Sequence, residues 1–409
     1  MYENLVNQSV SKDLISDIKN NRLPGAVLFS GSEASGKLTA ALETARILSC
    51  HASGNRRFDC TCPSCLQHKA LTCTNILLLG PRDCFLEISA SKKTFLNAVN
   101  SNATFLNAAR YLFLRSIRKL TLRFSDILWQ GDKNLNKIGA VIQDINENLE
   151  KLDFPRELPD FEELEKICDG LEKKSLDLET DYLYDSIPVS QIRNMEAWAH
   201  IKSEEGKKTI IIENADRMQS SVRNALLKIL EEPPADVVFI LLTSKRNAIM
   251  QTILSRVRTY NFKDRSVTEQ KDVITRVFHN ESFSGSINQY LLTFLPVKPE
   301  DIKGQSDLLF DSVANRQLPS IAEIVKKCGN FNPRVELKIF LENIMLRQRP
   351  MKNTPEGAEA AFETTKLLRN TWDNITLYNQ TPQGALEILL RDLAALNARG
   401  GNIFKCAVM

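Results

Sequence analysis

The sequence predicts an α/β domain with a parallel sheet, which carries a helical insertion and is followed by an all-helical region. Short apolar runs alternate with amphipathic runs near the N-terminus and again from about Ile187, which is typical of a parallel sheet covered on both faces. A polar, glycine-poor segment with a helical period separates these stretches, and no strand pattern follows Lys263. The expected parts are 1–262 with the insertion at about 84–185, a small helical lid at 263–305 and a helical domain at 306–409.

Apolar runs and their flanking residues predict the individual elements. Strands are expected at 26–30, 76–79, 209–212 and 237–242. Helices are expected from the first strand's loop to Leu48, at about 192–201 and at 221–230, and then at 264–280, 321–327, 334–346, 358–370 and 382–396.

Composition limits the class of protein. The chain has 409 residues, 43% of them hydrophobic and 25% charged, which is ordinary for a soluble globular protein of two or three domains. Its net charge of +3 is too small to indicate nucleic-acid binding by itself, so any DNA contact requires a local patch. No apolar run approaches the roughly 20 residues that span a bilayer, and we expect a cytoplasmic protein with no membrane partner.

A glycine loop between the first strand and its helix predicts a phosphate site. The run from Gly31 through Ser35 and Gly36 to Lys37 has the form of a P-loop, whose backbone amides and lysine surround an anion. Leu38 stands where a serine or threonine would bind Mg²⁺, and a bound ATP or a loop kept only as scaffold are both open.

The strand at 209–212 ends in Glu213-Asn214 instead of the acidic pair of a working P-loop ATPase. An amide takes no proton from water at neutral pH, so we expect no hydrolysis by this chain alone. Glu213 is either a metal-directed carboxylate or a surface acid that caps the loop. Thr243 is either a sensor of the phosphate or an ordinary strand-end hydroxyl.

Five cysteines fall within 24 residues, a density that indicates a metal site in a reducing compartment. Cys50, Cys60, Cys62 and Cys65 form the expected structural zinc site, which four thiolates would close to catalysis. Cys73, His51 and His68 are alternatives for one ligand, and a set of buried free thiols is the alternative to a metal site.

The insertion carries a basic stripe in its first half and acidic residues in its second. The stripe predicts either a solvated helix face that can pair with the acidic half or a DNA contact. Its residues are Arg110, Arg115, Arg118, Lys119 and Arg123, and the acids are Glu147, Glu150, Asp160, Glu162, Glu163 and Glu165.

Taken together, these motifs resemble bacterial DNA polymerase III clamp-loader subunits of the AAA+ group. The resemblance rests on RLPGAVLFSG at 22–31, the four cysteines, NALLKILEEPP at 224–234, Ser255-Arg256 and, more weakly, the C-terminal run at 378–390. Two features depart from the family pattern: the close spacing of Cys60 and Cys62, and the insertion.

The resemblance implies an AAA+ domain, a lid and a collar in a pentamer with other clamp-loader subunits, which loads a sliding clamp on primed DNA. Arg256 would be an arginine finger that acts in trans on a neighbouring ATPase subunit. Leu38 and Asn214 favour the delta-prime type, whose sites are commonly degraded, over a gamma/tau-like ATPase that hydrolyses ATP itself. An unrelated AAA+ chaperone or remodelling protein is a third, weaker alternative.

Overall fold

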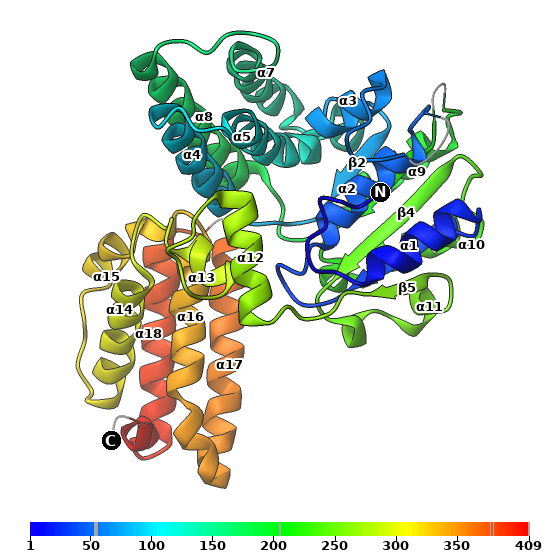
Figure 1. The fold of residues 1–409 in the computed structure, drawn as a ribbon. Helices are drawn as coiled ribbons and strands as arrows, with labels where there is room; N and C mark the ends of the chain where they lie inside the picture. The colour runs from blue at the N-terminus through cyan, green and yellow to red at the C-terminus, as the bar shows by residue number, and fades with distance from the viewer. Residues whose placement is uncertain (53–55, 204–205, 377, 379, 408–409) are drawn as a thin grey trace. The chain divides into compact units, whose positions relative to one another are not determined.

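A computed structural model describes residues 1–52, 56–203, 206–376, 378 and 380–407 of the chain (Figure 1). It divides into two compact units, Met1–Leu291 and Leu292–Met409.

The first unit is built on a parallel five-stranded sheet, which confirms the predicted α/β fold class. The strand order is β2-β3-β4-β1-β5. Their bounds are β1 Ala26–Ser30, β2 Ile76–Leu79, β3 Lys208–Ile212, β4 Val237–Thr243 and β5 Arg258–Asn261. β1 to β4 are buried along their whole length, as their apolar runs indicate. β5 was not predicted, because it reads Arg-Thr-Tyr-Asn and buries only Tyr260 fully.

Alternate residues of the strands belong to two separate hydrophobic cores. One face of the sheet contributes Leu28, Ile210 and Phe239 to one core, and the other contributes Val27, Ile211 and Ile240 to the second. The helices of this part are α1 Val10–Lys19, α2 Lys37–Leu48, α3 Pro63–Ala70, α9 Val189–His200, α10 Ser220–Glu231 and α11 Gln251–Leu254, with short helices η2 Ala215–Arg217 and η3 Arg246–Ala248. The chain then continues into α12 Val267–Phe278 and α13 Ile287–Leu292.

Helices between β2 and β3 share the core of one sheet face. They are α4 Phe85–Asn100, α5 Leu106–Thr121, η1 Leu122–Phe124, α6 Asp126–Trp129, α7 Leu135–Lys151 and α8 Phe161–Tyr182. Phe95, Phe113 and Leu178 belong to the same buried cluster as Leu28 of β1. The helical insertion is therefore packed as part of the first unit.

Every element described in the second unit is a helix, and these helices share one core. Its elements are α14 Pro299–Ala314, α15 Ile321–Lys327, η4 Gly329–Phe331, α16 Val335–Arg347, η5 Arg349–Asn353, α17 Pro355–Thr376, α18 Pro382–Arg399 and η6 Ile403–Ala407. In the C-terminal run at 378–390, residue 379 lies outside the described residues, and from Pro382 the run forms α18. None of the described helices is long and apolar enough to cross a membrane.

Candidate nucleotide edge and metal centre

The P-loop lies at the carboxyl edge of the sheet, where parallel strands end together. Ser30 of β1 pairs in register with Thr243 of β4, and Ile212 of β3 pairs with Leu241. Gly36 is the N-cap of α2 and has φ +92°, in the left-handed region that favours glycine. A Cβ at Gly31 would lie 2.7 Å from the Phe262 backbone oxygen, so only glycine fits there. The sequence thus forms the predicted strand, loop and helix.

Lys37 is satisfied by the carbonyl groups of its own loop. Its Nζ donates to the Gly31 oxygen at 2.7 Å, to the Ser32 oxygen and to Ser35 Oγ at 3.2 Å. Burial lowers the pKa of Lys37 to about 8, although Glu213 opposes this shift. The ammonium group thus closes the loop in which a phosphate would lie.

Leu38 is buried in the core beneath the loop. Its side chain belongs to the same cluster as Val27 and Ala41, so the position has an apolar structural role. A hydroxyl for Mg²⁺ is therefore missing from the position directly after Lys37, as the sequence indicated.

Glu213 is not a surface acid, so one of its two sequence alternatives is wrong. It is buried, and Arg82 Nη1 donates to its Oε1 at 2.9 Å. Arg123 Nη2 donates to its Oε2. Burial alone would raise the pKa of Glu213, but the two guanidinium groups outweigh it and lower the pKa. Both carboxylate oxygens are thus engaged inside the chain.

Asn214 and Thr243 also have internal partners. Asn214 Nδ2 donates to the Pro81 oxygen at 2.7 Å. The Thr243 hydroxyl donates to Asp216 Oδ1 at 2.7 Å and accepts from the Lys245 backbone amide at 3.0 Å. The residues expected around a nucleotide therefore lie at one edge of the sheet, which we call the nucleotide edge. Their polar groups form hydrogen bonds within the chain itself.

The basic stripe of α5 and η1 points inward, so the solvated face and the DNA contact were both wrong. Arg110 donates to the carbonyl groups of Leu152, Asp153 and Arg156, beyond the end of α7. Its own side chain is buried, as are those of Arg118 and Arg123.

Arg115 and Arg118 of the stripe cap the carboxyl end of α3, the helix that contains Cys65. Arg115 donates to the Lys69 oxygen and Arg118 to the Ala70 oxygen at 3.2 Å, in the last turn of α3. Cations at the carboxyl end of a helix satisfy its free carbonyl groups and its dipole.

The acidic partners of the stripe are Glu87, Asp153 and Glu213. The six acids predicted to pair with the stripe are exposed instead. The helical period was visible in the sequence, but the face that α5 buries depended on packing against α4 and α8.

Arg256 lies between α11 and β5, with its side chain 29% exposed. Its Nε donates to Glu231 Oε1 at 3.0 Å and its Nη1 to the Thr252 oxygen at 2.7 Å. Glu231 is the last residue of α10 and is half exposed. Arg256 is therefore held by an accessible acid on its own domain.

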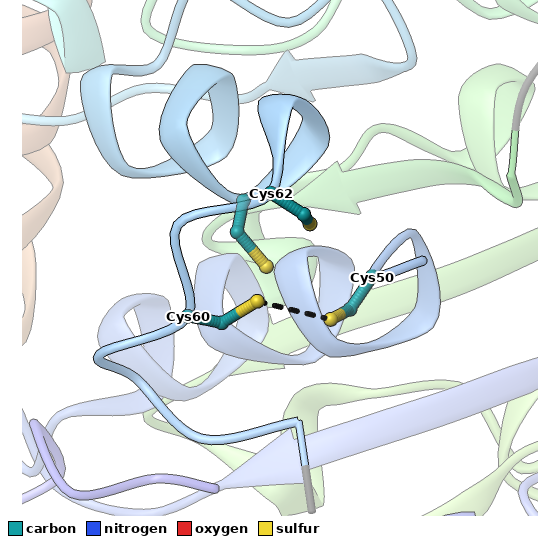
Figure 2. Close-up of side chains that lie close together, drawn as sticks. Cys50, Cys60 and Cys62 are labelled. Carbon is teal, nitrogen blue, oxygen red and sulfur yellow. Dashed lines mark hydrogen bonds between the residues drawn. The ribbon is translucent and has the colours of Figure 1, made fainter. Parts of the chain in front are cut away.

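The four predicted cysteines converge, and this group could hold a metal ion such as zinc. Figure 2 labels three of them, Cys50, Cys60 and Cys62. Their Sγ atoms all lie within 4.8 Å of one another, and those of Cys50 and Cys60 are 3.8 Å apart. Ideal tetrahedral zinc with Zn–S bonds of about 2.3 Å separates its sulfur atoms by about 3.8 Å. Cys50 follows α2, Cys62 is the N-cap of α3 and Cys65 lies in its first turn. The close spacing of Cys60 and Cys62 does not keep Cys60 out of the cluster.

The alternative ligands lie apart from these thiols. His68 Nδ1 is 3.6 Å from Cys73 Sγ, and both side chains are buried. His51 is exposed and is not part of the cluster.

Arg46 is a neighbour of the cluster that sequence reasoning missed. Its Nη1 donates to Cys65 Sγ at 3.0 Å, and its Nε donates to Glu43 Oε2 at 2.9 Å. Arg46 and Glu43 are both buried in α2. The three-residue spacing of a carboxylate and a guanidinium was visible, but only the fold brings Arg46 to a thiol.

Comparison with known proteins identifies the family. The model of the family described as "DNA polymerase III, delta subunit" matches residues 6–128 and 155–266, which is more than half of the chain. It runs through α4, α5 and α8 and leaves out residues 129–154, where α7 lies.

Curated relatives agree with this family. The delta' subunit of DNA polymerase III from Bacillus subtilis is 38% identical over 79 residues, covering 19% of this chain and 24% of that protein. The delta' subunit from Haemophilus influenzae is 29% identical over 107 residues, covering 23% of this chain and 33% of that protein. The tau subunit from Bacillus subtilis is 43% identical over 56 residues, covering 14% of this chain and 10% of that protein. The matches thus span a third or less of each relative. With a parallel sheet, a P-loop and this family match over more than half of its length, the chain belongs to the DNA polymerase III delta-subunit family.

Proposed function

We propose that this chain works as a delta-prime-like subunit of a DNA polymerase III clamp loader. It joins other clamp-loader subunits in a hetero-oligomer, which we expect to be pentameric, and the complex loads a sliding clamp on primed DNA. The internally satisfied nucleotide edge supports a subunit that does not hydrolyse ATP itself. In this arrangement the chain contributes to catalysis through a neighbouring subunit.

Arg256 is the residue that we propose for this contribution, as an arginine finger in trans. The supporting observation is its position after α11, where Glu231 is its acidic partner. An exposed ion pair of this kind contributes only about 0–1 kcal/mol, so the guanidinium can leave Glu231 for a phosphate at low cost. An arginine finger is worth roughly 10³- to 10⁵-fold in kcat, because it stabilises the charge of the transferring phosphoryl group.

The test is ATP hydrolysis by the loader reconstituted from this chain and its partner subunits, with primed DNA and clamp. We expect Arg256→Ala to abolish the contribution of the neighbouring ATPase site, and Arg246→Ala, an exposed arginine of the same domain, to leave it intact. Full ATPase activity with Arg256→Ala would reject the finger assignment.

A gamma/tau-like ATPase is the alternative function, favoured by the short match to a tau subunit. ATP turnover by the purified chain discriminates between the two. Hydrolysis by this chain alone, abolished by Lys37→Ala, would reject the delta-prime-like function.

We also propose that Cys50, Cys60, Cys62 and Cys65 hold a structural zinc ion. Four thiolates at tetrahedral spacing leave no open position for a substrate, so zinc would stabilise the loop between α2 and α3. Zinc near one equivalent per chain, lost in Cys62→Ser and Cys65→Ser, is the expected result. A purified, folded chain without zinc would reject this site.

A further inference from the structure

The magnesium ion that normally accompanies a P-loop does not fit the residues at this edge. Mg²⁺ requires oxygen ligands in near-octahedral geometry, commonly a hydroxyl after the P-loop lysine and a strand-end carboxylate. Leu38 offers no oxygen and is buried. Asn214 directs its amide nitrogen to the Pro81 oxygen, and both oxygens of Glu213 accept from arginine.

The negative charge of Glu213 is already offset by cations of the chain itself. Arg82 bridges Glu213 and Glu87, with its Nη2 2.8 Å from Glu87 Oε2. Lys119 is the second cation at Glu87. Three cationic side chains thus face two carboxylates, and Arg123 is almost completely buried, with 1% of its side chain exposed.

The other charged groups close to Lys37 do not alter this balance. Glu33 is exposed, and Asp216 accepts the hydrogen bond of Thr243. A divalent cation would have to displace Arg82, which is partly exposed, or the buried guanidinium of Arg123. Breaking a buried ion pair by removing one partner costs about 3–5 kcal/mol.

We infer that Arg82 and Arg123 take the role of the divalent cation at this edge, so that the chain holds no Mg²⁺ at Glu213. Any phosphate ligand of the loop would then be bound by Lys37 and backbone amides without metal. This inference rests on the proposed non-hydrolysing function and deepens it: the arginines exclude the metal independently of Leu38 and Asn214.

Arg123 makes the helical insertion part of this arrangement. It lies in η1, directly after α5, and its Nη1 also donates to the Gly80 oxygen at 2.8 Å. The same guanidinium therefore contacts the ends of β2 and β3. The insertion contributes the charge that replaces the metal.

The experiment measures Mn²⁺, as a paramagnetic substitute for Mg²⁺, by electron paramagnetic resonance on the full zinc-loaded chain with and without ADP. We expect wild type and Glu213→Gln to bind Mn²⁺ equally weakly, because Glu213 is not available. The double variant Arg82→Met with Arg123→Met should bind Mn²⁺ at least tenfold more tightly. Adding Glu213→Gln to it should remove that gain, which assigns the new site to the released carboxylate.

Two results would overturn the inference: tighter Mn²⁺ binding by wild type than by Glu213→Gln, or no gain in the double variant. If the double variant does not fold, Arg82→Met alone replaces it, because Arg82 is 30% exposed and leaves Arg123 in place. A smaller gain that Glu213→Gln removes supports the inference, and no gain contradicts it.

This outcome is separable from that of the proposed function. Mn²⁺ binding by wild type would reject the metal exclusion while leaving the effect of Arg256→Ala on the neighbouring ATPase intact. Conversely, loss of the Arg256 effect would reject the finger without changing Mn²⁺ binding.

Discussion

The nucleotide edge and the cysteine cluster are both sites that the sequence marks, yet their charged groups are arranged in opposite ways. At the nucleotide edge, Lys37 contacts carbonyl groups of its own loop, and Glu213 is bound by Arg82 and Arg123. In the cysteine cluster, four sulfur atoms face one another within 4.8 Å. The nucleotide edge contains the counter-charges of its own charged groups, whereas the cysteine cluster brings together four side chains that can bind one cation.

This difference indicates that the two sites are stabilised by different groups. Buried charges are stable only when they are paired, so a nucleotide edge without metal requires cations from elsewhere in the chain. Thiolates gathered at one point repel one another unless a metal binds them. We therefore expect the stability of the cysteine cluster to depend on a bound metal. The stability of the nucleotide edge should depend on its own charged side chains.

The largest expected effect is that of removing metal from the cluster. Structural zinc binds peptides with about 10–16 kcal/mol, so chelation or Cys65→Ser should lower the free energy of unfolding by roughly 5 kcal/mol or more. Zinc content by mass spectrometry and unfolding in urea with and without chelator measure this. Cys168→Ser, at a buried cysteine of α8, is the control that should keep zinc. Equal stability of the metal-free chain would contradict the comparison.

At the nucleotide edge, the next largest effect should come from Glu213→Ala. It leaves the buried Arg123 without its carboxylate, which typically costs about 3–5 kcal/mol of unfolding free energy. Urea unfolding measures the loss, with Glu232→Ala, at an exposed acid, as the control. Addition of Mg²⁺ should change neither value. A change below about 1 kcal/mol would mean that the arginines do not depend on Glu213.

Acid should weaken the same edge through Glu87. Burial raises the pKa of Glu87, but Lys119 and Arg82 outweigh this and lower it to about 2. A lowered pKa contributes stability above the unfolded value, near 4.5, that is lost as the pH falls toward 2. We expect Glu87→Gln to cost up to about 3 kcal/mol at pH 7 and to flatten the decline between pH 4.5 and 2. An unchanged acid profile in urea unfolding would contradict this.

Arg46 should have a smaller effect, on the cluster only. Partners of metal ligands typically contribute 10- to 100-fold in metal affinity, so Arg46→Met should weaken zinc binding by about that factor. Competition with a chromophoric chelator measures the affinity, and Arg22→Met, an exposed arginine, is the control. An undiminished affinity for zinc would show that Arg46 does not support the metal site.

The smallest expected effect is that of Glu231→Ala. Its ion pair with Arg256 is accessible, so the free energy of unfolding should change by less than about 1 kcal/mol. In the reconstituted loader, this variant should keep the ATPase activity that Arg256→Ala removes. A large loss of stability would show that Arg256 is a structural residue of its own domain.

Elements whose signals are local could be predicted from the sequence. The four buried strands, the glycine loop before α2 and the close grouping of the cysteines all follow from neighbouring residues, because apolar runs, glycine conformation and ligand spacing act over a few positions. β5 was missed because an edge strand with one fully buried residue carries little of that signal.

Only the tertiary structure decided which charges meet. The arginines of α5 and η1 have the spacing of a solvated face, and the six nearby acids offered apparent partners. Packing of α5 turned that face inward and brought Arg123 to Glu213, 90 residues away in sequence. Ion pairs depend on distances of a few ångströms, which spacing along one helix does not reveal. The amide of Asn214, in place of a catalytic carboxylate, was therefore visible in the sequence. The two arginine partners of the neighbouring Glu213 were visible only in the fold.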